Sequence, residues 1–175
     1  RSLPADLVAC GIGISPETAL AEAAGLEINN GIATDAQGRT SDPAIWAAGD
    51  CASFTVPGGR MRLESVGNAI DMAEAVAANI LGAGADYIPK PWFWSDQFDA
   101  KLQIAGLNAS YDQVVTRPGT GAHSGSVWYF REGRLIAVDA LNDARAYMIG
   151  KRLIEGGKSP TPKAVTDATD LKALM

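Results

Sequence analysis

Cysteine, histidine and basic charge are all scarce in this sequence, and each shortage excludes a class of protein. The 175 residues include one histidine and two cysteines, Cys10 and Cys51, which stand far apart and form no CxxC pair. We therefore expect no metal site and two free thiols, as in a reducing cytoplasm. The formal net charge of −5 argues against nucleic-acid binding as a primary role, because that role needs a basic surface.

Long apolar runs are absent too, although apolar residues are plentiful. No run approaches the roughly 20 residues of a membrane span, and no signal peptide is visible, so we expect a cytoplasmic protein without membrane contact. Hydrophobic residues make up 47% of the chain and charged residues 20%, which is typical of a globular protein with a real core. The length predicts one domain or two small ones.

The opening segment has the pattern of a strand, a glycine turn and a short helix. An apolar run at residues 7–10 predicts the strand, and Gly11 and Gly13 predict the turn. Ser15 as N-cap and Pro16 as the first helical residue predict where the helix begins. This order of elements indicates a piece of an α/β domain.

The next segment predicts a hairpin, a buried strand and a long amphipathic helix. The turn of the hairpin is expected near residues 35–38, and the strand at residues 45–48. Residues 64–81 repeat apolar side chains at helical spacing, and Ser65 or Glu64 is the expected N-cap. The apolar positions of this helix are Val66, Ala69, Ile70, Ala73, Val76, Ala77, Ile80 and Leu81.

A linker rich in glycine and proline, residues 82–91, divides the sequence into two halves. Three of the four tryptophans lie beyond it, among several strand-like runs. Glu132 and Gly133 mark a hairpin turn, and a helix is expected from about residue 144 to 154. The predicted fold class is therefore α/β followed by α+β, the second part being a small antiparallel sheet with helices.

Asp50 is the first candidate for a functional residue. It follows the predicted strand at residues 45–48, and the carboxyl end of a strand is where α/β sheets bind ligands. Gly49 allows close backbone approach, and the helix that starts near Ser65 presents free N–H groups and a partial positive charge. A strand-end aspartate together with a helix N-terminus suits a flavin nucleotide, because the carboxylate could bind the ribityl chain. The residues alone leave open the alternative that Asp50 merely caps a turn.

Several longer stretches resemble one family in the same order. "TSDPAIWAAGDCA" is similar to the second FAD-binding motif of flavoprotein reductases with two dinucleotide-binding domains, and "RLESVGNAIDMAEAVAANILG" to their flavin-facing helix. "PWFWSDQFDAKLQIAGL" and "GRLIAVDALNDARAYMIGKRLI" resemble the C-terminal domain of FAD-dependent NADH:ferredoxin reductases, the family of putidaredoxin, rhodocoxin and aromatic-ring dioxygenase reductases. The N-terminal FAD fingerprint and the NAD GxGxxG of that family are absent. The chain therefore resembles the C-terminal portion of such a reductase.

This resemblance implies a division of the chain and a set of partners. Residues 1–15 would end an NAD-binding domain, residues 16–85 would close an FAD-binding domain, and residues 86–175 would form the C-terminal reductase domain. The parent enzyme would pass electrons from NADH or NADPH through FAD to a [2Fe-2S] ferredoxin that serves a monooxygenase or dioxygenase. Without the N-terminal FAD and NAD domains, we expect the 175-residue chain to be inactive and to self-associate.

The resemblance also implies roles for particular residues, none of which is a catalytic acid or base. The expected FAD contacts are Gly49, Asp50, Glu64, Ser65, Val66, Trp92, Phe93 and Trp94, and Gly11 and Gly13 are expected near the NAD. Ordinary core packing is the alternative for the tryptophans. Arg60 and Arg62 would dock an acidic ferredoxin, or else form a solvated loop. His123 is expected in a loop without a chemical role.

Two other functions remain open at this point. The chain could be an FAD-free interaction or dimerisation module, and a colourless purified protein would favour that. Among flavoenzymes, an NADH oxidase or a rubredoxin reductase would share the same motifs.

Overall fold

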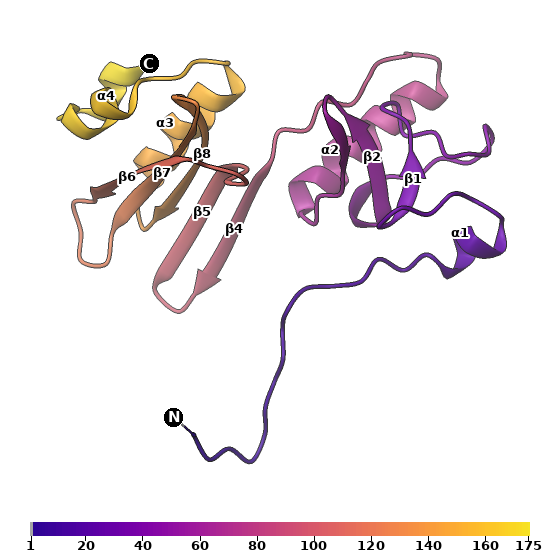
Figure 1. Cartoon of the computed structure of the whole chain (residues 1–175), viewed down its shortest axis with the longest axis horizontal. Helices are drawn as coiled ribbons and strands as arrows, with labels where there is room; N and C mark the ends of the chain where they lie inside the picture. The colour runs from indigo at the N-terminus through magenta and orange to yellow at the C-terminus, as the bar shows by residue number, and fades with distance from the viewer. Residues whose placement is uncertain (1) are drawn as a thin grey trace.

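The computed structural model describes residues 2–175 and consists of two lobes (Figure 1). An irregular segment at residues 83–91 joins them, where the sequence predicts the linker. Each lobe has a separate hydrophobic core: the buried members of one lie between Ala47 and Tyr87, and those of the other between Ala105 and Leu171. These cores agree with a two-part chain, while the three domain limits stay a prediction.

The N-terminal lobe is a small sheet with one long helix. It comprises α1 (Ala19–Ala23), β1 (Ile32–Thr34), the 3-10 turn η1 (Gly49–Cys51), β2 (Ala52–Val56), β3 (Gly59–Met61) and α2 (Val66–Ile80). Strand β2 is central, parallel to β1 and antiparallel to β3. Phe54 of β2 and Met72 of α2 are fully buried, because the helix covers the sheet with its inner face.

The predicted strand at residues 7–10 is wrong, and so is the predicted helix start. Residues 7–10 belong to no helix or strand and are exposed, since no other strand of the described chain pairs with them. Figure 1 shows this segment extending away from both lobes. The helix begins at Ala19 after Thr18, instead of at Pro16 after Ser15.

The predicted turn near residues 35–38 is confirmed, but the strand at residues 45–48 is wrong. The Asp35 carboxylate accepts hydrogen bonds from the backbone N–H groups of Gln37 and Arg39, which closes the turn. Only an isolated bridge between Arg39 and Trp46 continues the hairpin. The chain then turns at Gly49, whose φ of +79° favours glycine, and the true strand starts three residues later.

Helix α2 confirms the predicted helix and its cap, but only part of its predicted inner face. Ser65 Oγ accepts a hydrogen bond from the backbone N–H of Asn68 at 3.2 Å. Val76 is buried as expected, whereas Val66, Ile70 and Ile80 are more than half exposed. The polar residue Asn68 is buried among the inner positions instead, for reasons given below.

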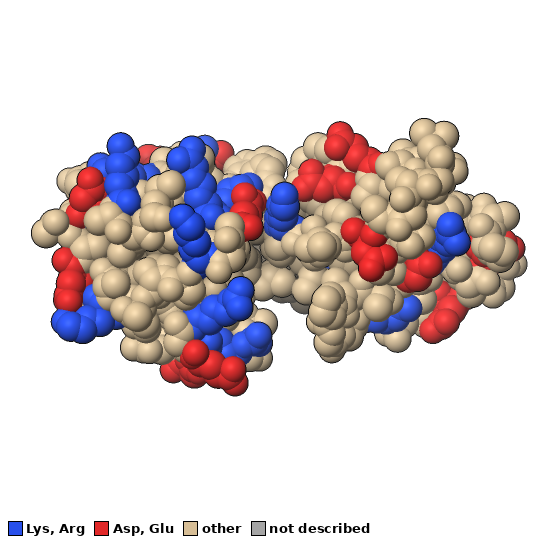
Figure 2. All heavy atoms as spheres, turned by 90° about the horizontal axis from the view of Figure 1, so that it is seen from above, with Lys and Arg blue, Asp and Glu red and all other residues tan. Residues whose placement is uncertain are grey.

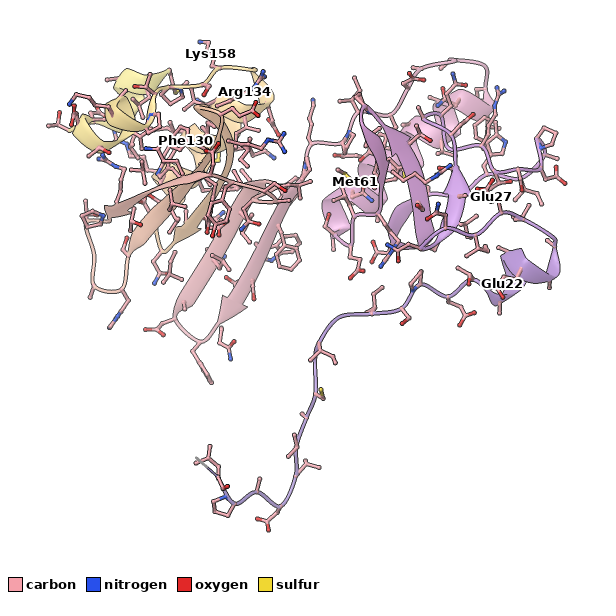
Figure 3. All side chains as sticks on the ribbon, viewed as in Figure 1. Glu22, Glu27, Met61, Phe130, Arg134 and Lys158 are labelled. Carbon is pink, nitrogen blue, oxygen red and sulfur yellow. The ribbon has the colours of Figure 1, made fainter. Side chains whose placement is uncertain are left out.

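The C-terminal lobe is a five-stranded antiparallel sheet covered on one face by helices. Its elements are β4 (Trp92–Gln97), β5 (Ala100–Gly106), β6 (Gln113–Pro118), β7 (Gly125–Arg131), β8 (Arg134–Leu141), α3 (Ala144–Glu155), α4 (Pro162–Asp167) and η2 (Leu171–Leu174). The strand order is β4-β5-β8-β7-β6. Phe130 of β7 is fully buried between this sheet and the helices (Figure 3). The predicted hairpin turn at Glu132 and Gly133 and the helix predicted from about residue 144 to 154 are confirmed, as is the α/β and α+β class.

Two further features bear on function. Within residues 2–175 no helix is long and apolar enough to cross a membrane. Over the same residues, no group of three or more His, Cys, Asp or Glu side chains is placed to hold a metal ion.

Candidate functional site

A cavity of about 250 Å³ lies where α2 begins and the C-terminal sheet comes closest to it. Four of the predicted site residues, Glu64, Ser65, Trp92 and Phe93, line it together. The remaining wall is formed by Leu63, Pro91, Ile104, Gly106, Leu107 and Asn108. The sequence therefore predicted one side of this cavity from each lobe, but not the side that β5 contributes.

The first turn of α2 is held in place by a buried amide. The side-chain Nδ2 of Asn68 donates to the carbonyl of Leu63 at 3.0 Å, and its Oδ1 accepts from the Tyr87 hydroxyl at 3.0 Å. Its backbone N–H is taken by Ser65. The N–H groups of the two residues before it have no intrahelical acceptor, because the first turn of any helix lacks one. This end of α2 therefore offers donors and a partial positive charge to an electron-rich ligand.

Asp50 lies beside this helix with its carboxylate exposed. Gly49, next to it in η1, packs against α2: a Cβ at that position would lie 3.5 Å from the Cβ of Ala69. Among residues 2–175, no hydrogen bond or ion pair engages the Asp50 carboxylate, and η1 has no side-chain cap. Capping a turn is therefore not what this side chain does here. The Asp50 carboxylate is therefore free to accept hydrogen bonds from hydroxyl groups near the N-terminus of α2.

Arg62 ties Asp50 to Glu64. Its Nη1 lies 2.7 Å from the Glu64 carboxylate and donates to the backbone carbonyl of Asp50 at 3.2 Å. The Arg62 side chain is only 10% exposed. Arg60 is used in a similar way, because its Nη1 donates to the carbonyls of Thr34 and Ser53 across β1 and β2. Both guanidinium groups thus have structural partners, and ferredoxin docking by them stays a prediction.

The aromatic residues of β4 form a stack, not a scattered cluster. The rings of Trp92 and Trp94 are nearly parallel, with centroids 5.3 Å apart and an interplanar angle of 20°. Trp92 lines the cavity, whereas Trp94 lies behind it and is 39% exposed. A Cβ on Gly67 would lie 2.5 Å from Nε1 of Trp92, so the indole rests against the backbone of α2. The packing interpretation therefore applies to Trp92, and its contact with FAD stays a prediction.

The other predicted residues lie apart from the cavity. Gly11 and Gly13 are in the exposed N-terminal segment, with open space where a Cβ would be. His123 is exposed in the turn between β6 and β7, as predicted for a loop residue. The Val66 side chain is exposed at the first position of α2 and does not line the cavity.

Sequence reasoning missed several residues that shape the cavity. Asn68 and Tyr87 are 19 positions apart, and Trp92 and Lys151 are 59 positions apart, so no local pattern links either pair. A polar residue among apolar helix positions was the available signal for Asn68, because a buried amide needs partners.

The two halves of the chain match two protein families. The pyridine nucleotide-disulphide oxidoreductase family matches residues 1–73, and the reductase C-terminal family matches residues 92–175. A ferredoxin–NAD(P)(+) reductase from Sphingomonas sp is 45% identical over 99% of this chain, and rhodocoxin reductase from Rhodococcus erythropolis is 41% identical over 96%. The chain spans only 43% and 40% of the length of these two relatives.

Solved structures agree with these matches. The ferredoxin reductase of the CYP199A2 system from Rhodopseudomonas palustris superposes with a TM-score of 0.92 at 45% identity, over 99% of this chain and 44% of that one. Putidaredoxin reductase in its covalent complex with putidaredoxin gives 0.89 at 38% identity, over 98% and 42%. Residues 1–73 therefore belong with the pyridine nucleotide-disulphide oxidoreductases and residues 92–175 with the reductase C-terminal family, and over nearly its whole length the chain is similar to part of the ferredoxin reductases that combine the two.

Proposed function

We propose that this chain closes the FAD site of an NAD(P)H-dependent ferredoxin reductase and carries its C-terminal domain. The observation that carries the proposal is the cavity at the start of α2, where Glu64 and Ser65 meet Trp92 and Phe93. Arg62 holds Asp50 beside this cavity, because the same guanidinium contacts the backbone of Asp50 and the carboxylate of Glu64. Resemblance alone assigned these residues to one site, and their proximity in the fold supports it.

The residues present fit the flavin end of FAD, but not its ADP half. The Asp50 carboxylate would accept hydrogen bonds from ribityl hydroxyls. The backbone N–H groups of Val66 and Gly67 would face the electron-rich pyrimidine edge of the ring, where the helix dipole favours negative charge. Trp92 and Phe93 would bound the ring on the side of the C-terminal lobe and exclude water. The ADP half would need a glycine-rich turn, and the described residues include no such turn at the site.

When bound, FAD would supply the chemistry: it accepts a hydride from NAD(P)H and releases electrons singly. The side chains of this site would bind and orient the cofactor and would transfer no proton themselves. Ser65 is occupied in capping α2, and Glu64 is paired with Arg62. Their engagement supports a site that works by positioning and electrostatics.

The proposed acceptor is a [2Fe-2S] ferredoxin that serves an oxygenase in the cytoplasm. The names of the relatives support a ferredoxin-type acceptor, and the charge distribution offers a place for an acidic one. Eleven of the fifteen Lys and Arg residues lie at or beyond Lys90, whereas eleven of the twenty Asp and Glu lie at or before Asp86. Figure 2 shows the basic side chains gathered mainly on the C-terminal lobe. Electrostatic steering of an acidic partner would therefore act on that lobe.

The proposal is tested by adding FAD to two proteins. The first is the 175-residue chain, which should bind FAD weakly, because one carboxylate and one helix end must overcome an association cost of at least ~4 kcal/mol. The second is a chimera in which this chain follows the N-terminal part of the Sphingomonas relative. It should retain FAD and reduce a ferredoxin with NADH or NADPH. A chimera that folds but stays colourless would contradict the proposal.

A second candidate is an FAD-free interaction module formed by the C-terminal lobe. Its separate core, built around Trp128 and Phe130, favours independent folding of this lobe. A colourless chimera that still forms a defined complex would support it.

A further inference from the structure

Trp92 is a residue at which the C-terminal lobe meets the start of α2. It opens β4, and a Cβ on Gly67 would lie 2.5 Å from its Nε1 and 2.8 Å from its Cε2. The indole therefore occupies space that a glycine leaves open. It also lines the cavity beside Glu64 and Ser65. The orientation of this one ring consequently shapes the wall of the proposed flavin site.

Lys151 of α3 contacts the same ring from within the C-terminal lobe. Its Nζ lies 4.9 Å from the Trp92 ring centroid, within the roughly 6 Å over which cation–π attraction acts. The ammonium is also 3.3 Å from the carboxylate of Glu155, one turn further along α3. The Lys151 side chain is 24% exposed, so this charge is held in place and partly withdrawn from water. Partial desolvation strengthens attraction to an aromatic face.

Trp94 completes the set of contacts around Trp92. The two residues are i and i+2 on one strand, so their side chains share a face of the sheet. Their rings stack at 5.3 Å. Three independent groups thus restrain one indole: the helix backbone at Gly67, the ammonium of Lys151 and the ring of Trp94.

We infer that Lys151 is a positioning residue, whose ammonium holds Trp92 against Gly67 and parallel to Trp94. Helix α3 thereby sets the shape of the cavity wall beside α2, although Lys151 itself does not line that cavity. The relevance to flavin rests on the proposed function, but the positioning is a property of the chain alone. Removing the Lys151 charge alone should free the Trp92 ring to rotate, even when a side chain of the same length is kept.

The tryptophan pair supplies a direct spectroscopic test. Two stacked indoles couple their electronic transitions and give a paired positive and negative band in circular dichroism, and Trp94→Phe in the 175-residue chain identifies that band. Lys151→Met keeps the length of the side chain and removes its charge. We expect it to lower the paired band, because loss of a cation–π contact of modest strength shifts the equilibrium from held to rotated rings roughly two- to fivefold.

Two further variants separate charge from general disruption. Lys151→Arg should restore the band, because a guanidinium also binds aromatic faces. Lys163→Met should leave it unchanged, since Lys163 forms the same i,i+4 pair, with Asp167, on a different helix. Urea unfolding of each variant shows whether it is folded. If Lys151→Met does not fold, Glu155→Gln replaces it, with a smaller but measurable loss expected.

A full-strength band in folded Lys151→Met would overturn the inference, as would a folded Lys151→Arg that fails to restore it. An unchanged band in Glu155→Gln would do the same where that variant is used. The spectra need no FAD, so weak FAD binding by the chain leaves this test intact. An FAD-retaining chimera combined with an unchanged band would keep the proposed function and remove the role of Lys151.

Discussion

The hydroxyl of Tyr87 donates a hydrogen bond to Oδ1 of Asn68, across 3.0 Å in the interior of the N-terminal lobe. Tyr87 belongs to the linker segment, and Asn68 to the first turn of α2. The same amide donates to the carbonyl of Leu63. The start of the helix that faces the proposed flavin site is therefore fixed by the residue where the chain leaves the lobe.

Tyr87→Phe should destabilise the N-terminal lobe and change how its stability depends on pH. The lost hydrogen bond is worth about 0.5–1.5 kcal/mol. Burial, and then the charge of Asp71, raise the pKa of Tyr87 to about 12. Its contribution to the free energy of unfolding is therefore complete below pH 10, where the unfolded tyrosine is still neutral, and is lost as the pH rises towards 12. Urea unfolding at several alkaline pH values measures both effects.

The variant should lose stability less steeply than wild type over that alkaline window. Tyr129 and Tyr147, whose pKa values are also raised by burial, remain in both proteins, so the comparison isolates Tyr87. Identical slopes in the two proteins would show that Tyr87 is not the responsible group.

Asp50→Ala should weaken FAD retention by the chimera. It removes a charge-assisted acceptor for a ribityl hydroxyl, worth roughly 1.5–3 kcal/mol, or about a ten- to hundredfold rise in Kd. Stability should change little, because the Asp50 carboxylate has no partner in the described chain. Flavin absorbance after gel filtration and dilution measures retention. Asp96→Asn, at a surface pair with Lys101, is the control, and equal retention by both variants would count against the ribityl assignment.

Arg62→Gln should cost more stability than Arg60→Gln. The Arg62 side chain is nearly buried and pairs with Glu64, so its loss leaves a carboxylate without its partner, at a cost of about 1–3 kcal/mol. Urea unfolding checks this order. If the two arginines also steer ferredoxin, the double variant of the chimera should lose ferredoxin-dependent rate mostly at low salt. Equal loss at low and high salt would reject steering and leave the structural role.

The sequence predicted those features of the fold that local chemistry specifies. Ser65 caps α2 because its hydroxyl can reach a backbone N–H three residues on, and Asp35 closes its turn in the same local way. The prediction of a strand at residues 45–48 was wrong. Its apolar residues resemble a buried strand, but the chain turns at Gly49 before a strand can form. The apolar run at residues 7–10 failed for another reason: a strand needs a neighbour to pair with, and sequence alone does not supply one.

The candidate site was predictable only in part for a related reason. Motif order assigned Asp50, Ser65 and Trp92 to one proposed site, and the fold places Ser65 and Trp92 in the same cavity. Asp50 contacts Arg62 within the N-terminal lobe, and Trp92 contacts Lys151 within the C-terminal lobe. Both contacts depend on how each lobe folds, and no spacing in the sequence encodes that. The arginine illustrates this limit: as a sequence it reads as an exposed charge, and in the fold it is an internal link.

Gly67→Ala should displace Trp92 and destabilise the contact between the lobes. In an exposed helix position the same change would stabilise by up to about 1 kcal/mol, because alanine favours helices. Here a Cβ would lie 2.5 Å from the indole, and overpacking of this kind typically costs 1–3 kcal/mol. Urea unfolding, monitored by tryptophan fluorescence, shows whether Gly67→Ala lowers or raises the free energy of unfolding. Gly11→Ala, where a Cβ would meet open space, is the control. Stabilisation by Gly67→Ala would mean that the indole moves aside without cost.

The 175-residue chain should self-associate, and the outer face of α2 is the surface that drives it. Val66, Ile70 and Ile80 lie at helical spacing and are each more than half exposed. Exposed apolar side chains also occur at residues 7–10, but an isolated extended segment presents no continuous surface. A contiguous apolar stripe on a rigid helix is a typical interaction surface.

Sedimentation velocity at several protein concentrations tests this expectation. Wild type should form dimers or larger species, and Ile70→Lys combined with Ile80→Lys should shift the chain towards monomer, because charges on the stripe prevent its burial. Phe98→Lys is the matched control, since Phe98 is exposed alone at the tip between β4 and β5. A wild-type chain that stays monomeric at every concentration would show that the stripe is too small to hold two copies together. Equal loss of association in the control would place the contact on the C-terminal lobe instead.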